Sequence, residues 1–147
     1  MRIVVQEQPF DLGAEVSAFA AGRHDLGAVV TFTGVVRDDP AKPLAQMMIE
    51  HYPGMTERAV EKIATEAQAR WPLGDVLVIH RFGVLHPGEQ IMMVATAARH
   101  RKDAFEAAEY LMDYLKSRAP FWKMEKGAAG EGWVAARSAD EDALKRW

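Results

Sequence analysis

Hydrophobic residues along the first third of the chain form three apolar runs separated by polar turns. The second run, residues 28–36, is rich in β-branched side chains, which is typical of a buried strand. Between the first two runs, Asp11 is placed to cap a helix with apolar residues at helical spacing, and this helix should end near Gly22. Two prolines and two aspartates between positions 38 and 43 predict a loop. The three predicted strands span residues 2–6, 28–36 and 45–51.

The middle of the chain predicts one helix followed by a pair of strands. Thr56 is a suitable cap for a helix in which apolar residues recur every three to four positions, and Pro72 stops this helix. Residues 76–85 and 90–98 are long apolar segments, each typical of a buried strand. Because a turn-forming sequence at 86–89 lies between them, a β-hairpin is expected.

A long helix and two short elements complete the predicted structure. Helical spacing of apolar residues extends from about position 102 to position 118. Residues 133–137 suggest a last strand, and Ser138 with Glu141 forms the pattern of a capping box for a short C-terminal helix. There is no internal repeat, low-complexity segment or linker. Helices and strands mix without a regular βαβ repeat, so the sequence predicts one α+β domain over residues 1–147.

Composition restricts the classes of protein that this chain can represent. Its 147 residues are 49% hydrophobic and 27% charged, which is ordinary for a globular protein. The formal net charge of -3 gives no general attraction to nucleic acid, so any anion site must be local. Cysteine is absent, which excludes a disulfide scaffold, a thiolate nucleophile, a zinc–thiolate site and a persulfide carrier.

The sequence also bears on location. No apolar run approaches the ~20 residues that a membrane helix requires. The N-terminal residues 1–6 have the pattern of a strand and lack that of a signal peptide. A cytoplasmic location is therefore expected.

Two lysines on either side of Pro120 form the most informative feature of the chain. Lys116 falls in the last turn of the long helix, because a proline cannot continue a helix and disfavours helical geometry just before it. Lys123 then lies in extended chain. A turn at Pro120 would bring both ammonium groups together beside Phe121 or Trp122, where they could hold an anion. The alternative is that each lysine is a solvated surface residue, Lys116 complementing the helix dipole.

A second cationic feature lies where the last apolar strand leads into the long helix. Residues 99–102 are Arg-His-Arg-Lys, at a helix N-terminus that already presents positive potential. Positive charge there is unfavourable unless an anion binds, so an anion site and an exposed charge run are both open interpretations. Arg37 follows the strand that contains Gly34, a residue that could mark a bulge or a close ligand approach. By itself Arg37 could equally reach solvent.

Other polar residues point to structural roles. His80 lies within a strand and is expected to be a hydrogen-bonded core or interface residue, and Asp113 is expected to pair with Lys116 on the helix surface. No HExxH pattern or similar ligand spacing occurs, so no metal is expected. Phosphate-loop, dinucleotide-binding and nucleophile-elbow motifs are also absent.

These residues occur in segments that together resemble the large, catalytic subunit family of molybdopterin synthase. The resemblance extends from about Ile3 to Trp147 and is specific, because the lysine segment occurs with the His-Arg and Thr-Phe-Thr-Gly segments. One departure is Val35, where the family often has lysine. The matching segments are Gly27–Gly34 with Arg37, Glu50–Met55, Arg70–Gly74, His80-Arg81 with Gly83, Pro87-Gly88, His100-Arg101 with Ala104–Ala107, Asp113–Lys116, Ala119–Lys123, Trp133 and Lys145–Trp147.

The resemblance implies a fold, a reaction and a partner. The fold would be an α/β hammerhead with an additional antiparallel β subdomain. The reaction would convert cyclic pyranopterin monophosphate (precursor Z) to molybdopterin, a step of molybdenum cofactor biosynthesis. Sulfur would come from the C-terminal thiocarboxylate of a small ubiquitin-like subunit, in a heterotetramer built on a homodimer of this chain. No cofactor is implied, and the lack of cysteine agrees with a sulfur that arrives on the partner.

The resemblance also implies roles for individual residues. Lys116 would be the central catalytic amine, and Lys123 would act beside it as a proton donor or electrostatic stabiliser. Arg37, His100 and Arg101 would bind the substrate phosphate, so these five side chains are expected to form one anion site. The further substrate-binding residues implied are Val35, Val36, Met124, Glu125 and Arg137, and whether Arg137 acts within its own chain or across the dimer interface stays open.

Two functions of other classes stay open from the sequence. A noncatalytic dimer could dock a ubiquitin-like tail or an acidic ligand without turnover, although both lysines are present. An RNA-binding domain using the 99–102 run is less favoured, because the net charge is negative and no RNA-binding motif occurs. An assay for dithiolene product would separate these functions.

Overall fold

The computed structural model describes all 147 residues and contains two four-stranded sheets. The first, sheet A, has the order β1-β4-β6-β2, with β1 parallel to β4 and the other neighbours antiparallel. Its central strand β6 is almost continuously apolar because helices cover both of its faces. The strands of sheet A are β1 (Arg2–Gln6), β2 (Ala28–Val35), β4 (Leu73–Arg81) and β6 (Gln90–Ala98).

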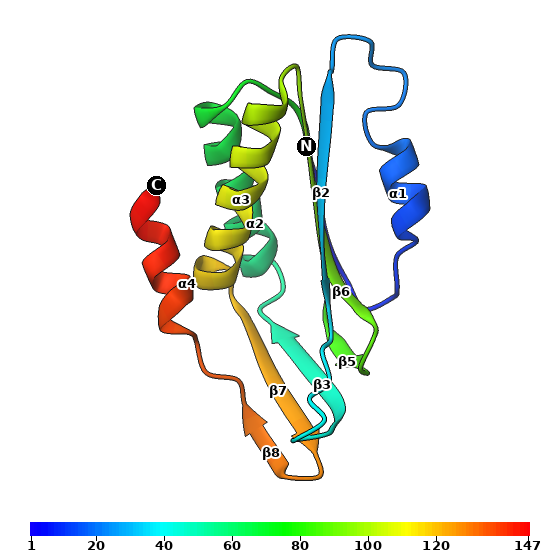
Figure 1. Cartoon of the computed structure of the whole chain (residues 1–147), viewed down its shortest axis with the longest axis vertical. Helices are drawn as coiled ribbons and strands as arrows, with labels where there is room; N and C mark the ends of the chain where they lie inside the picture. The colour runs from blue at the N-terminus through cyan, green and yellow to red at the C-terminus, as the bar shows by residue number, and fades with distance from the viewer.

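The second sheet, sheet B, is antiparallel throughout and has the order β5-β3-β7-β8. It extends beyond one end of sheet A, in the lower part of Figure 1. The α+β class and the additional antiparallel sheet are thus as predicted. The strands of sheet B are β3 (Leu44–His51), β5 (Gly83–Leu85), β7 (Phe121–Gly127) and β8 (Gly130–Trp133).

The helices lie on the two sides of sheet A. Helices α2 and α3 cover one face and the short α1 covers the other, while α4 lies beside α3 (Figure 1). As predicted, Asp11 caps α1 by accepting a hydrogen bond of 2.9 Å from the Ala14 amide. None of the helices combines the length and apolar character that crossing a bilayer requires. The helices are α1 (Leu12–Ala18), α2 (Met55–Arg70), α3 (Arg101–Arg118) and α4 (Ser138–Ala143), followed by the 3-10 turn η1 (Leu144–Arg146).

The main hydrophobic core lies between sheet A and helices α2 and α3. It continues under sheet B through Met47, Ile49 and Leu85, so both sheets share one apolar interior. A smaller cluster on the other face of sheet A packs against α1. Because the shared interior fixes sheet B against the end of α3, it also fixes the strand that carries Lys123.

The predicted strand 76–85 is two strands, so the expected hairpin is only partly correct. Its first part, β4, pairs with β6, whereas β5 leaves sheet A and pairs with β3 in sheet B. The chain changes sheets at Gly83, whose φ of 89° is rarely adopted by other residues. The hydrophobic pattern missed this junction because both strands are apolar and face the same core.

Three smaller predictions were wrong. Gly54, not Thr56, occupies the cap of α2, and the Thr56 hydroxyl instead donates to the Tyr52 carbonyl at 2.9 Å. The capping box at Ser138 does not form, because Glu141 pairs with Arg118 at 2.7 Å. The last strand is residues 130–133, and the predicted continuation to 137 is irregular. At Ser138 a tertiary contact with α3 thus competes with the local capping pattern.

Candidate functional site

The two predicted lysines lie on consecutive elements joined by Pro120. Helix α3 ends at Arg118, and β7 begins at Phe121 with its amide donating to the Ala119 carbonyl at 2.8 Å. Lys116 is exposed in the last turn of α3, whereas Lys123 is partly buried on β7. The prediction of one lysine at a helix end and one in extended chain is confirmed.

The surroundings of Lys123 show that the two lysines share one electrostatic environment. Burial lowers the pKa of Lys123, and the nearby positive charge of Lys116 lowers it further. Two carboxylates, Asp140 and Glu125, act in the opposite direction and favour the charged form. Lys123 is therefore a partly desolvated ammonium group close to a second ammonium group, an arrangement suited to holding an anion.

One aromatic wall lies on the Lys123 side of β7. Phe121 and Lys123 lie on the same face of the strand, because side chains alternate along it. Phe121 stacks on His80 with ring centroids 3.7 Å apart and planes at 15°. Trp122 faces the opposite side and packs edge-on against Tyr52 at 4.7 Å. Of the two aromatic candidates, the geometry selects Phe121.

His80 is a core residue at this end of the molecule, as predicted. Its Nδ1 atom lies 2.8 Å from the Arg81 carbonyl, which makes Nδ1 the protonated nitrogen. Burial lowers the pKa of His80 to about 3, and the charge of Lys123 contributes in the same direction. His80 is therefore neutral at physiological pH and adds no third positive charge beside the lysines.

His100 and Arg101 lie at the other end of α3. Both side chains are exposed, and His100 occupies the N-cap position without a side-chain capping bond. Arg101 and Lys116 are 15 positions apart, which corresponds to roughly 22 Å along a helix. Within one chain these two residues therefore do not join the lysine pair, and the expectation of a five-residue anion site in a single chain is not met.

Arg37 lies at the same end of the molecule as the lysines. Strand β2 is antiparallel to β6, with Val35 opposite Gln90, so the chain leaves β2 at the end where β6 begins. The register shifts between Gly34 and Val35, so the bulge suggested by Gly34 is present. Helix α3 runs back along β6 toward that end (Figure 1), and Arg37 is exposed there.

The remaining predicted residues differ in what their side chains can reach. Val35 is 49% exposed, whereas Val36 is a core residue whose amide donates to the Glu89 carbonyl at 2.9 Å. Its carbonyl accepts from the Gly88 amide at 2.8 Å, so a ligand can reach Val36 only through the second lone pair of that carbonyl. By strand alternation Met124 faces away from Lys123 and Glu125 faces the same side. Arg137 is exposed before α4.

The predicted cations have no anionic partners within the chain. None of the following six makes an ion pair within the chain: Arg37, His100, Arg101, Lys116, Lys123 and Arg137. The expected pair between Asp113 and Lys116 is absent, because Asp113 instead accepts from Arg146 at 2.7 Å. Lys116 is thereby left free for an external anion. No group of histidine and carboxylate side chains has metal-binding spacing.

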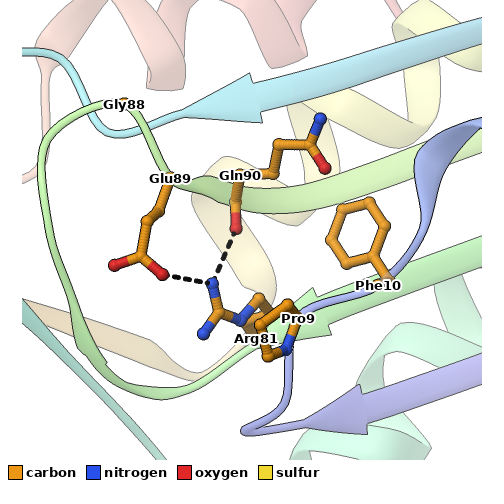
Figure 2. A pocket seen from close by; sticks show the side chains of 6 residues that line it. All are labelled: Pro9, Phe10, Arg81, Gly88, Glu89 and Gln90. Carbon is orange, nitrogen blue, oxygen red and sulfur yellow. Dashed lines mark hydrogen bonds and ion pairs between the residues drawn. The ribbon is translucent and has the colours of Figure 1, made fainter.

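A separate pocket beside the end of β4 contrasts with the lysine site (Figure 2). Arg81 lies in its wall and is almost fully buried. Its Nη1 atom donates to Glu89 at 3.2 Å and to the Gln90 carbonyl at 3.3 Å, and its Nε atom donates to the Glu7 carbonyl at 3.1 Å. Because this cation is already neutralised, the pocket is a weaker anion site than the lysine pair.

Sequence analysis missed the contribution of the C-terminal segment to this site. Asp140 lies in α4 and influences Lys123, although 17 positions separate the two residues. No spacing rule links a six-residue helix to a strand that distant in sequence. The only available signal was the unusual density of charged residues near the C-terminus.

Comparison with known proteins gives consistent results over the whole chain. Residues 5–118 match the family model described as MoaE protein. The molybdopterin synthase catalytic subunit of Cereibacter sphaeroides is 64% identical over 147 residues, which is 100% of both chains. The molybdopterin biosynthesis MoaE protein of Burkholderia ambifaria is 55% identical, with a TM-score of 0.85 over 99% of this chain and 97% of that one.

A more distant structure shares the fold. It is a protein–protein complex of subunits 1 and 2 of the molybdopterin-converting factor from Helicobacter pylori. The matched chain is 20% identical, and the alignment covers 92% of each chain with a TM-score of 0.77.

Proposed function

The chain belongs to the MoaE protein family, and we propose from this premise that it is the catalytic subunit of a molybdopterin synthase. It would convert cyclic pyranopterin monophosphate to molybdopterin, using sulfur from the C-terminal thiocarboxylate of a small ubiquitin-like subunit. The single observation that carries the proposal is the lysine pair. Lys116 and Lys123 come together without carboxylate ion pairs, at a site that an anionic tail and an anionic substrate could occupy.

Lys116 is the central catalytic amine in this proposal. Its exposed ammonium group can contact both the thiocarboxylate and the substrate, because no side chain of the protein binds it. Lys123 is partly desolvated, so its positive charge acts more strongly on developing negative charge than a solvated lysine would. The lowered pKa of Lys123 also makes it a better proton donor near neutral pH.

The phosphate of the substrate is assigned to Arg37, His100 and Arg101. Since His100 and Arg101 lie roughly 22 Å from Lys116 along α3, a second copy of the chain is needed to bring them to the lysine pair. The homodimer within the heterotetramer supplies that copy. Arg137 is assigned to the same pocket, and its exposure on the outside of the fold suits contact across the dimer.

The other substrate contacts are assigned by their accessible atoms. Val35 offers an exposed side chain, and Val36 offers only the second lone pair of a carbonyl that already accepts from Gly88. Glu125 lies on the Lys123 side of β7 and would contact substrate beside it. Met124 faces the other side of β7, so its contribution would come through its backbone.

The small subunit and the cellular location complete the proposal. The Helicobacter pylori structure is a complex of two subunits, which supports assembly of this chain with a small sulfur-carrier subunit. The relatives are bacterial biosynthetic enzymes, and on that basis we assign the chain to the cytoplasm.

Reconstitution with purified components tests the proposed function. The protein is mixed with precursor Z and the thiocarboxylated small subunit, and dithiolene formation is measured. The control is the same small subunit with an ordinary C-terminal carboxylate, which should bind but give no product. Tail binding without any product from the thiocarboxylated form would favour the noncatalytic docking module instead.

A further inference from the structure

The C-terminal segment returns from sheet B to the end of α3 that carries Lys116. It begins beside the other lysine, because the Val134 amide donates to the Lys123 carbonyl at 2.7 Å. It then forms α4, which lies beside the C-terminal half of α3 (Figure 1). One short segment thus contacts both of the elements that carry the lysines.

Two contacts fix α4 against the last turn of α3. The Ser117 hydroxyl donates to the Asp140 carbonyl at 3.1 Å, and Arg118 pairs with Glu141 at 2.7 Å. Ser117 and Arg118 directly follow Lys116 in sequence. These contacts therefore set the position of Asp140 relative to the lysine at the helix end.

The rest of the segment is held along the same helix. The Trp147 indole donates to Asp113 at 2.7 Å, Arg146 donates to the same carboxylate at 2.7 Å, and Arg70 donates to the Trp147 carbonyl at 3.0 Å. Trp147 also packs edge-on against Trp71 with centroids 5.6 Å apart. Because contacts extend over its whole length, the segment is a fixed part of the site.

Asp140 differs from the other acidic residues of α4. Glu141 pairs with Arg118, and Asp142 pairs with Lys145. Asp140 is partly buried and has no ion pair of its own, although unpaired carboxylates on a surface helix normally face solvent. Its carboxylate contributes favourably to the charged form of Lys123.

The charged groups that act on Lys123 come from three elements. Lys116 on α3 disfavours its charge, and Glu125 on β7 favours it. His80 on β4 is neutral because of its burial. Of the two carboxylates that act on Lys123, Glu125 lies on the same strand and Asp140 lies on a different element, α4.

We propose that Asp140 is a positioning residue, held against the last turn of α3 by the Ser117 contact, that provides the counter-charge of the Lys116–Lys123 pair. This inference deepens the proposed function, since it concerns how the same site is held ready for an anion. A fixed carboxylate offsets the repulsion between two ammonium groups before substrate binds. Because it sits on a separate helix, it can do so without occupying the space in which the substrate anion binds.

A matched pair of substitutions tests the proposal. Asp140→Asn removes the charge and keeps the backbone carbonyl that Ser117 binds, and Asp142→Asn is the control two positions along the same helix. The titration of the Lys123 side chain is followed by NMR in the full-length chain. Asp140→Asn should shift the midpoint to lower pH, whereas Asp142→Asn should leave it in place.

Turnover of the reconstituted complex gives the second measurement. Loss of Asp140 charge should move the high-pH decline of activity to lower pH and so reduce turnover on that limb. Ser117→Ala removes a contact that positions Asp140 without changing charge, so it should move the decline in the same direction but by less than Asp140→Asn. The NMR titration does not depend on the reaction, so it still decides the proposal if the proposed function fails. An Lys123 midpoint that is the same in Asp140→Asn and wild type, or shifts equally in Asp142→Asn, would overturn it.

Discussion

Both ends of α3 carry cationic side chains, but only at the C-terminal end do other parts of the chain pack around them. At the C-terminal end, Lys116 meets the partly buried Lys123, and the C-terminal segment provides Asp140 nearby. At the N-terminal end, His100 and Arg101 are exposed and make no ion pair within the chain. The first end is a formed electrostatic site, whereas the second is a cationic surface that requires a partner.

This difference shows that the number of cations does not define an anion site. The helix dipole favours positive charge at the C-terminus of α3 and opposes it at the N-terminus. Partial burial of Lys123 on β7 then strengthens its electrostatic interaction with an anion. Water screens the exposed charges at residues 99–102. We therefore expect catalysis to depend on the C-terminal end, and the N-terminal end to contribute substrate binding in the assembled dimer.

The largest effect is expected for Lys116→Ala. If Lys116 is the central amine, its loss should reduce turnover by about 100-fold or more. The thiocarboxylate and the substrate would both lose the ammonium group that contacts them. The control is Lys102→Ala at the opposite end of the same helix, where the lysine lies 3.9 Å from Glu106. Product formation under single-turnover conditions is the measurement, with circular dichroism as the check on folding. Near wild-type turnover in Lys116→Ala would remove this lysine from the catalytic role.

Mixing two inactive variants tests whether the two ends of α3 meet across a dimer. One variant is Lys116→Ala, and the other combines His100→Ala with Arg101→Ala, which should mainly weaken substrate binding. If a site takes its lysine from one copy and its arginine from the other, random exchange should restore about a quarter of wild-type turnover at low substrate concentration. If all of these residues act within one chain, each chain of a mixed dimer still carries one of the two sets of substitutions, so no site is intact. No recovery would then refute the two-copy site.

Two histidines, the buried His80 on β4 and the exposed His100 at the start of α3, should differ in their effect on stability. The folded-state pKa of His80, about 3, lies below its ordinary value of 6.5, so the unfolded chain binds a proton more readily. The stabilising effect of neutral His80 is thus complete above pH 6.5 and is lost as pH falls toward 3. By pH 5 the loss should be about 2 kcal/mol. Chemical denaturation of wild type and His80→Phe at pH 7 and pH 5 measures this, and exposed His100→Phe is the control.

A slope between pH 7 and pH 5 that is equal in wild type and His80→Phe would contradict a neutral, buried His80. Comparing slopes, not absolute stabilities, removes any packing change caused by the substitution itself. It also removes the contribution of carboxylates that titrate in all three proteins.

The smallest effect is expected from Asp113→Ala, which removes one of the contacts that hold the C-terminal segment on α3. Asp113 accepts from both Arg146 and the Trp147 indole, each at 2.7 Å. Loss of these bonds should lower the Tm by about 4 °C. Asp142→Ala, which loses only an exposed pair with Lys145, should change the Tm much less. Equal shifts in the two variants would show that the segment is not held through Asp113.

Local patterns predicted most elements because each is specified by neighbouring residues. Pro120 ended α3 where expected, and Asp11 capped α1. The predictions failed where distant residues competed for the same groups. Glu141 bonds Arg118 instead of capping its own helix, and Gly83 sends an apolar run into a second sheet. Asp113 likewise binds the C-terminus instead of the neighbouring Lys116.

By itself the sequence determined the α+β class, the lysines on either side of Pro120 and the cationic run before α3. Proline geometry, helix periodicity and charge at a helix terminus are properties of adjacent residues, so they can be recognised without a fold. Only the tertiary structure decided that Phe121 and not Trp122 lies beside Lys123, that the charge of Asp140 acts on Lys123, and that His100 and Arg101 lie roughly 22 Å from Lys116. Desolvation and charge coupling depend on distances through space, and those distances are fixed by packing between segments far apart in the sequence.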